Sequence, residues 1–230
     1  MRRYWIFVLV VVVLVALVAV GDRVALTQVE QQVAQRLQSQ LALAEQPTVV
    51  VGGVPFLTQV VTNRFTDVEL SGRGVPAGTP ERPLEVDRLD VELSGVRTAD
   101  WFSRISAEQL GGSAKVTWEE ISEQVGAVVT PQDAGRVRVD ITADLYGQQV
   151  PFIISARPVL DVASQEVHLS EPQVVVATYR VPDEVVERVA AESIPPVDLS
   201  LPLGLSANDL QVTDSHLDLG LHGTHVQLVD

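Results

Sequence analysis

The sequence predicts an α+β protein in which a long N-terminal amphipathic helix packs in a strongly curved antiparallel β-sheet, after an N-terminal transmembrane helix. Three observations predict this arrangement. An uncharged apolar run opens the chain, apolar residues then recur at helical spacing, and most of the remaining chain alternates between apolar and polar residues. These patterns are typical of a membrane span, an amphipathic helix and half-buried strands, respectively.

The N-terminal run from Tyr4 to Val20 contains no charged residue and follows Arg2 and Arg3. About 17 residues at ~1.5 Å rise cover about 26 Å, the short limit for a membrane helix. Basic residues before such a run favour a cytoplasmic N-terminus. We therefore expect residues 1–21 to be a single-pass anchor in the cell membrane and residues 22–230 to form one domain outside the cytoplasm. The alternative is a signal peptide, after whose cleavage the domain is secreted.

Beyond Gly21 the apolar residues take the period of a helix that ends before Pro47. They recur at intervals of three and four and share one stripe. The stripe consists of Leu26, Val29, Val33, Leu37, Leu41 and Ala44. Because helix propensity alone rarely holds a helix in water, the stripe needs a partner, and we expect it to pack on the sheet.

Residues 136–147 give the clearest strand, since apolar residues alternate there with charged and polar ones. Residues 84–96 alternate too, but the phase changes after Val86, which predicts a bulge near Asp87-Arg88 and hence strong curvature. Residues 71–83 are expected to be an exposed turn. Further strands are expected at Phe65–Leu70, Val150–Ile154, Val159–Val162, Val167–Leu169, Val174–Tyr179, Leu210–Val212, Leu217–Leu221 and Val226–Val229.

Two short helices are expected to interrupt the strands. Thr117 and Glu120 have the spacing of a capping box, which predicts a helix over Trp118 to Val125. A second helix is expected to open at Pro182 and to end before Pro195-Pro196.

Composition excludes several functions. The chain has no cysteine, so disulfides, a thiol nucleophile and a thiolate metal site are excluded. A formal net charge of −14 argues against nucleic acid as a partner and disfavours electrostatic adhesion to anionic lipid. The motifs of serine hydrolases, phosphate loops, dinucleotide binding and zinc proteases are all missing. We therefore expect no enzyme, no catalytic residue and no cofactor.

Three histidines near the C-terminus are the best metal candidates in the sequence. His222 and His225 could converge only across a turn at Gly223-Thr224, since residues three apart in a strand face opposite sides. We expect them, with His216, to be exposed hairpin residues rather than metal ligands.

The segment Val49 to Phe65, VVVGGVPFLTQVVTNRF, contains no acid. We expect a short helix to begin at Pro55 and to stop at Asn63 in the left-handed conformation. Phe56 and Leu57 then either fill a closed core or border an apolar cavity, and the sequence leaves both alternatives open. One face of this helix is expected to carry Leu57, Val60 and Val61.

Two motifs carry a resemblance to a known family: GVPFLTQ at 53–59, and LPLGL at 201–205 leading into the last strands. With the long helix, they resemble the actinobacterial LmeA-like family of envelope phospholipid-binding proteins, and through it the tubular lipid-binding, BPI-like superfamily. The chain departs from the family pattern at Thr62-Asn63 and at Asp214-Ser215-His216, where relatives have glycine. It also lacks the cysteine of lipoprotein relatives.

The resemblance implies a helix lying in a curled antiparallel sheet, with a lipid channel between them. It implies non-catalytic binding, and with it transfer, of phospholipid or another acyl-chain lipid, and makes envelope-biogenesis proteins further candidate partners. The residues implied in lipid contact are Val29, Val33, Leu37, Leu41, Phe56, Leu57, Val60, Val91, Ile141 and Phe152. The first alternative is a closed-core scaffold that recruits envelope proteins through its acidic surface. The second is a hydrolase whose site is assembled from dispersed residues.

Overall fold

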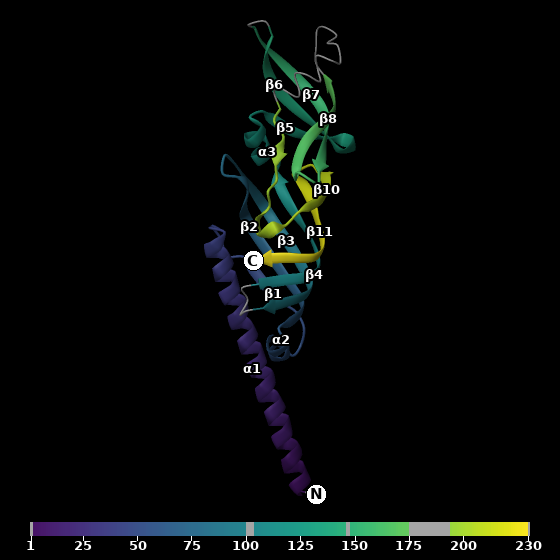
Figure 1. The fold of residues 1–230 in the computed structure, drawn as a ribbon. Helices are drawn as coiled ribbons and strands as arrows, with labels where there is room; N and C mark the ends of the chain where they lie inside the picture. Colours follow the sequence, from purple (N-terminus) through teal and green to yellow (C-terminus); the bar gives the residue numbers. More distant parts are fainter. Residues whose placement is uncertain (1, 100–103, 146–147, 175–193, 230) are drawn as a thin grey trace.

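The structure is a computed structural model that describes residues 2–99, 104–145, 148–174 and 194–229, with side chains along the first helix described from Val20 onward. It confirms the α+β class, with antiparallel strands dominating (Figure 1). The helices are α1 (Arg2–Gln40), α2 (Phe56–Thr62) and α3 (Trp118–Val125), with 3₁₀ turns η1 (Asp133–Gly135) and η2 (Pro202–Gly204).

The described strands form two antiparallel sheets rather than the one curved sheet that was expected. The six-stranded sheet has the order β1 (Thr48–Val51), β2 (Arg64–Thr79), β3 (Arg82–Ala99), β4 (Arg104–Thr117), β11 (His216–Val229) and β10 (Ala207–Val212). The five-stranded sheet has the order β5 (Val128–Gln132), β6 (Arg136–Leu145), β7 (Gln148–Asp161), β8 (Glu166–Val174) and β9 (Val197–Asp198). The six-stranded sheet is curled and lies nearer to α1, while α3 covers the other sheet (Figure 1).

The β2–β3 hairpin corrects two predictions. Residues 71–83 are mostly strand rather than an exposed turn, because the long β3 offers a partner as far as the pair Thr79–Arg82. The bulge predicted near Asp87-Arg88 is also wrong, since the register between β2 and β3 does not shift there. Gly74 on β2 instead has a positive φ of 58°, which glycine adopts at little cost. At this level of the hairpin, the alternation of inward- and outward-facing side chains shifts in both strands.

Two pairs of predicted strands are each one continuous strand. β7 joins the strands expected on either side of residue 156, and β11 joins those on either side of Gly223-Thr224. The predicted turn there is wrong because β4 pairs continuously with β11 at this point, Gly223 opposite Leu110 and Thr224 opposite Gln109. The helix predicted from Pro182, and the strand beyond Val174, lie outside the described residues.

The helix α1 packs against the edge strand β1 and against α2, and its N-terminal half extends away from the sheets (Figure 1). Leu26 and Ala34 on α1 are buried, and so is Leu43, which follows the C-terminal end of the helix. Leu26 and Leu43 belong to the hydrophobic core. Where side chains are described, no helix is long and apolar enough to span a membrane. The predicted span at residues 4–20 lies almost wholly outside that part of the chain.

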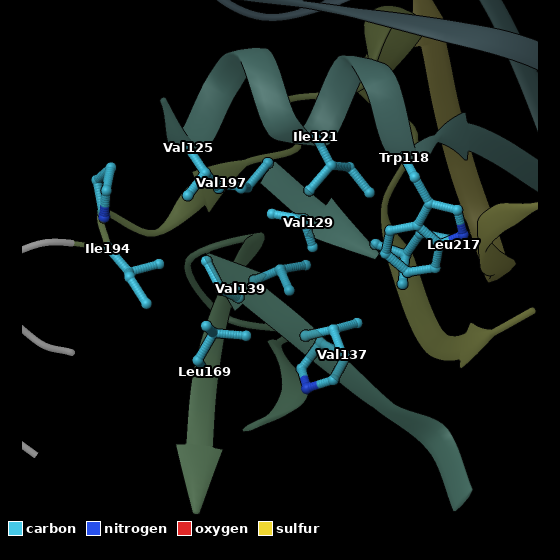
Figure 2. A pocket seen from close by; sticks show the side chains of 13 residues that line it. Trp118, Ile121, Val125, Val129, Val137, Val139, Leu169, Ile194, Val197 and Leu217 are labelled. Atoms are coloured by element: carbon cyan, nitrogen blue, oxygen red, sulfur yellow. The ribbon is translucent and has the colours of Figure 1, made fainter. Parts of the chain in front are cut away.

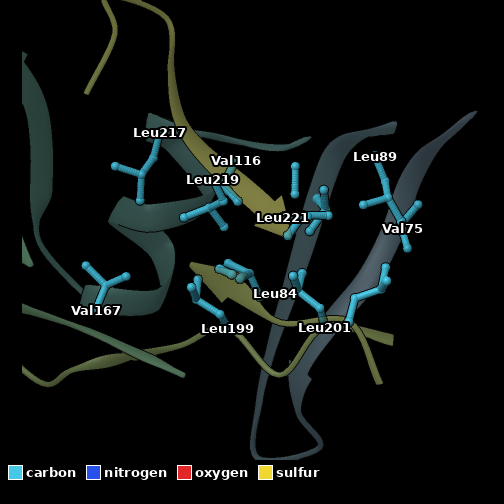
Figure 3. Packing of buried hydrophobic residues seen from close by; sticks show 14 of the residues in the cluster. Val75, Leu84, Leu89, Val116, Val167, Leu199, Leu201, Leu217, Leu219 and Leu221 are labelled. Atoms are coloured by element: carbon cyan, nitrogen blue, oxygen red, sulfur yellow. The ribbon is translucent and has the colours of Figure 1, made fainter. Parts of the chain in front are cut away.

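The apolar interior of the six-stranded sheet is covered by the segment that precedes β10. Leu199 and Leu201 are 1% and 8% exposed and belong to the same core as the leucines of the sheet. Figure 3 shows them facing Leu84, Leu219 and Leu221. The expected position of the long helix inside the curl is therefore taken by this segment, which we call the leucine strap (residues 199–205).

One glutamine fastens the leucine strap to the five-stranded sheet. Gln165, in the turn between β7 and β8, donates from Nε2 to the carbonyl oxygen of Ala207 (3.0 Å) and accepts from the amide of Ala207 through Oε1 (2.7 Å). Its own carbonyl oxygen accepts from the amide of Leu199 (3.0 Å). Because Ala207 is fully buried, the glutamine side chain satisfies backbone groups that no water reaches.

Gln165→Ala is expected to lower the melting temperature by several degrees. The substitution leaves the amide and the carbonyl of Ala207 buried without partners, at a cost of about 1–3 kcal/mol for each group. Differential scanning calorimetry of the variant beside Gln211→Ala, an exposed glutamine on β10, measures the effect. Equal and small shifts in the two variants would show that the glutamine bonds are dispensable.

Candidate functional site

An apolar cavity of about 40 Å³ lies between α3 and the five-stranded sheet. Figure 2 shows Ile121, Val129 and Val139 pointing toward one another across it. No lining side chain is ionisable. The lining comes from Trp118, Ile121, Val125, Val129, Val137, Val139, Pro158, Val167, Leu169, Ile194, Pro195, Val197 and Leu217.

The roof of the cavity is α3, and the predicted capping box holds its start. The Thr117 hydroxyl oxygen accepts from the amide of Glu120 (3.2 Å), and Gly126 ends the helix with a φ of 72°. The indole N–H of Trp118 donates to the carbonyl oxygen of Thr213 (3.1 Å), which fixes the orientation of the ring. With this polar group satisfied, the Trp118 ring contributes apolar surface to the cavity.

The floor of the cavity follows from strand periodicity. Val137 and Val139 on β6 are buried, whereas Arg138 between them is partly exposed. Val139 pairs with Val129 on β5, so two valines from neighbouring strands stand side by side under α3. Branched residues of this size leave space that larger side chains would fill.

The remaining wall is formed by residues 194–197, whose described strand pairing is short. Its last residue begins β9, a strand whose pairs with β8 are Val167–Val197 and Glu166–Asp198. Arg82 also donates from Nη1 to the carbonyl oxygen of Pro196 (3.4 Å). A two-residue ladder contributes little to stability compared with the long ladder between β7 and β8. Among the described strand ladders around the cavity, that of β9 is therefore the weakest.

The cavity can receive apolar groups but offers no acid, base or nucleophile. At about 40 Å³ it is well below the roughly 150 Å³ of an engineered cavity that binds benzene, so an acyl chain can enter only if the cavity widens. Among the described residues, no group of three His, Asp or Glu side chains is placed to hold a metal ion. His216 is half-buried near Asp87 (3.5 Å), and His222 and His225 are exposed on β11.

A second, polar hollow of about 290 Å³ opens where α1 passes into β1. Arg73 and Arg88 stand directly opposite each other on β2 and β3, and Arg88 also contacts Asp90 through Nε (2.9 Å). Like charges paired directly across strands cost stability, and the contact of Arg88 with Asp90 offsets part of this cost. Its lining consists of Glu45, Gln46, Thr48, Ser71, Gly72, Arg73 and Arg88.

The GVPFLTQ motif forms a fixed junction between α1 and α2. Both oxygens of Asp22 on α1 accept from the first amides of α2, that of Phe56 (3.0 Å) and that of Leu57 (2.7 Å). Gln59 bridges the flanking backbone, since it donates to the carbonyl oxygen of Gly52 (2.9 Å) and accepts from the amide of Thr66 (3.0 Å). The motif therefore locks α2 in place.

The two ends of this junction explain its residue choices. Gly53 has a φ of 90°, and a Cβ there would lie 2.6 Å from Oγ1 of Thr66, so only glycine fits. Asn63 ends α2 at a φ of 53°, which confirms the predicted left-handed stop. The carboxylate of Asp22 has a pKa below its ordinary value, because the amides of Leu57 and then Phe56 donate to its charged form.

The model of the LmeA-like phospholipid-binding family matches residues 20–222. The chain belongs to this family. No curated protein and no solved structure matches it. The matched range includes both GVPFLTQ and LPLGL, and the resemblance to the LmeA-like family is confirmed.

In this LmeA-like chain, none of the residues expected to contact lipid lines the cavity under α3. Phe56 is buried with its ring centroid 6.2 Å from that of Phe65, and Leu57 is 42% exposed. Three expected residues are buried in the sheets: Val91 on β3, and Ile141 on β6, which pairs with Phe152 on β7. The partly buried ones are Val29, Val33, Leu37, Leu41 and Val60. Their contact with lipid stays a prediction.

Sequence reasoning missed both the cavity and the role of Asp22. The capping box and the alternation of β6 predicted the two elements on either side of the cavity but gave no sign that they face each other. Asp22, which follows the apolar run, was a usable signal for its capping role. The start of α2 has no side-chain cap of its own, so its first amides need an acceptor from another element.

Asp22→Asn is expected to lower the melting temperature at neutral pH but not in acid. A depressed folded-state pKa means that the carboxylate stabilises the fold above its unfolded pKa of about 3.9 and loses this effect as the pH falls through the folded value. Thermal unfolding of parent and variant from pH 7 to pH 3 should show a gap in melting temperature that narrows toward the acid end. The control is Asp133→Asn, which removes an exposed carboxylate. A gap that does not change with pH would contradict the capping role.

Proposed function

We propose that this chain binds membrane phospholipid without catalysis and that the cavity under α3 receives an acyl chain. The observation that carries the proposal is a cavity lined without any ionisable side chain in a member of a phospholipid-binding family. Each methylene transferred from water into such a lining contributes about 0.8 kcal/mol, so a few buried methylenes offset the cost of a modest opening.

Binding requires the closed cavity to widen, and its walls differ in how firmly they are held. The strands β6, β7 and β8 pair along most of their lengths, whereas Ile194–Val197 is fixed by the short ladder of β9. Displacement of that segment would open the cavity toward Val167 and Leu169 without breaking the main sheet. The same opening and closing serves pick-up and release, which is the requirement for transfer.

The proposed location of the domain is the outer side of the cell membrane, with residues 4–20 as its span. The support is the uncharged run itself, preceded by two arginines. A net charge of −14 makes electrostatic adhesion to anionic lipid unfavourable, so an inserted helix is the better means of attachment.

A second candidate is a closed-core module that recruits other envelope proteins. The small volume of the cavity favours it, because a core that never opens would look the same. The two functions differ in whether the purified protein takes up lipid.

Leu169→Trp is expected to weaken lipid binding at least several-fold while the fold is retained. Leu169 lines the cavity and is only half-buried, so a larger side chain can occupy the space meant for a lipid tail. Leu210→Trp, at a half-buried position on β10 outside the cavity, is the matched control. Displacement of a fluorescent phospholipid measures affinity, and native mass spectrometry shows bound lipid. No lipid uptake by the parent protein would favour the scaffold instead.

Val12→Asp is expected to reduce the fraction of full-length protein that floats with neutral phosphatidylcholine vesicles. A carboxylate at the centre of a membrane helix costs about 2.5–3.5 kcal/mol on insertion scales. The control is Gln31→Asp, an exposed position on α1 beyond the proposed span. Parent protein that stays at the bottom of the gradient would show that residues 4–20 are not an anchor.

A further inference from the structure

Exposed apolar side chains gather at one end of the described part of the molecule. The described residues include eight large hydrophobic side chains that are exposed. Five of the eight lie on α2, on the turn before it or on the adjoining part of α1. They are Val20 (63% exposed), Val24 (55%), Val54 (73%), Leu57 (42%) and Val61 (82%). A concentration of this kind on a soluble surface marks a contact with a partner or a membrane.

The Asp22 carboxylate fixes this apolar end at a defined level along α1. Its hydrogen bonds to the amides of Phe56 and Leu57 place the start of α2 beside residue 22. Residue 22 is two positions beyond Val20, which is about 3 Å along the axis at ~1.5 Å per residue. The apolar face of α2 therefore lies at the level where the uncharged run of α1 ends.

The charges around this end also suit a lipid surface. The chain has 30 acidic residues, yet none falls between Val49 and Phe65. The acid nearest the start of α2 is Asp22, which is buried and bonded to amides. Arg23 and Arg64, which flank Asp22 and α2 in the sequence, are exposed cations. The exposed acid Asp67 lies farther along β2, where its carboxylate accepts from the hydroxyl of Ser94 (3.1 Å). In an acidic protein, the segment 49–65 itself therefore presents no carboxylate that anionic headgroups would repel.

We propose that α2 rests in the interfacial layer of the membrane that residues 4–20 span, with Val54, Leu57 and Val61 in contact with lipid. This proposal rests on the anchoring proposed above. The run of about 26 Å is a few ångströms shorter than the ~30 Å hydrocarbon core, so its end lies within the boundary region. A short helix fixed at that depth exposes its apolar side chains to acyl chains and headgroups rather than to water.

Because α1 and α2 are locked together, this contact fixes the orientation of the whole domain. An anchor helix alone could tilt and rotate, whereas a helix with a second apolar contact beside it has one preferred rotation about its axis. In this orientation the six-stranded sheet stands on the membrane, and the sheet with the cavity lies farther away (Figure 1).

Single labelled cysteines test the contact, because the chain has no cysteine of its own. Full-length Val61→Cys and Val162→Cys are each labelled with an environment-sensitive fluorophore in phosphatidylcholine vesicles that carry nitroxide lipids. Val162 is 48% exposed in the distant turn between β7 and β8 and serves as the control. Nitroxide lipids are expected to quench the label at residue 61 several-fold more than the label at residue 162.

A third label at Val12→Cys separates the two proposals. Strong quenching at residue 12 with equal, weak quenching at residues 61 and 162 would overturn the contact of α2 while the anchor stands. Weak quenching at all three positions, with the protein free of vesicles, would overturn the anchor and the contact together. A label at residue 61 that is shielded from water but not quenched by lipid would identify a second copy of the chain as the occupant and also overturn the proposal.

Discussion

The inner face of the six-stranded sheet is apolar and must be covered, and the rest of the structure depends on how this is achieved. The leucine strap covers it, and the strap stays in place because Gln165 provides the hydrogen bonds that a neighbouring strand would otherwise provide. One side-chain amide thus joins two sheets that share no strand ladder. It also allows a single hydrophobic core to run through both of them.

The same principle operates at the other end of the molecule. A helix as short as α2 is unstable alone, and no side chain of its own caps its first amides. Asp22 caps them from α1, so the GVPFLTQ motif acquires its shape from an acid more than 30 positions earlier in the chain. At both ends, a polar side chain that satisfies backbone groups determines where apolar surface is buried and where it stays exposed.

Local patterns predicted the elements well. Thr117 and Glu120 predicted α3 to the residue, and Asn63 predicted the end of α2. These local patterns could not predict which elements distant in the sequence pack against each other. The turn expected at Gly223-Thr224 is a strand because β4 runs beside it, and the curl is filled by the leucine strap rather than by α1. The cavity could not be predicted for the same reason, since Ile121 and Val139 meet only through the packing of separate elements.

The wall of the cavity and the leucine strap are consecutive parts of one peptide, with Val197 and Leu199 two residues apart. Displacement of the wall therefore pulls on the strap, whose buried leucines cover the apolar face of the six-stranded sheet. A guest that pushes the wall aside would thus act on the core that both sheets share, and not on one cavity alone. The free energy of opening would then depend on how well the leucines of the strap repack.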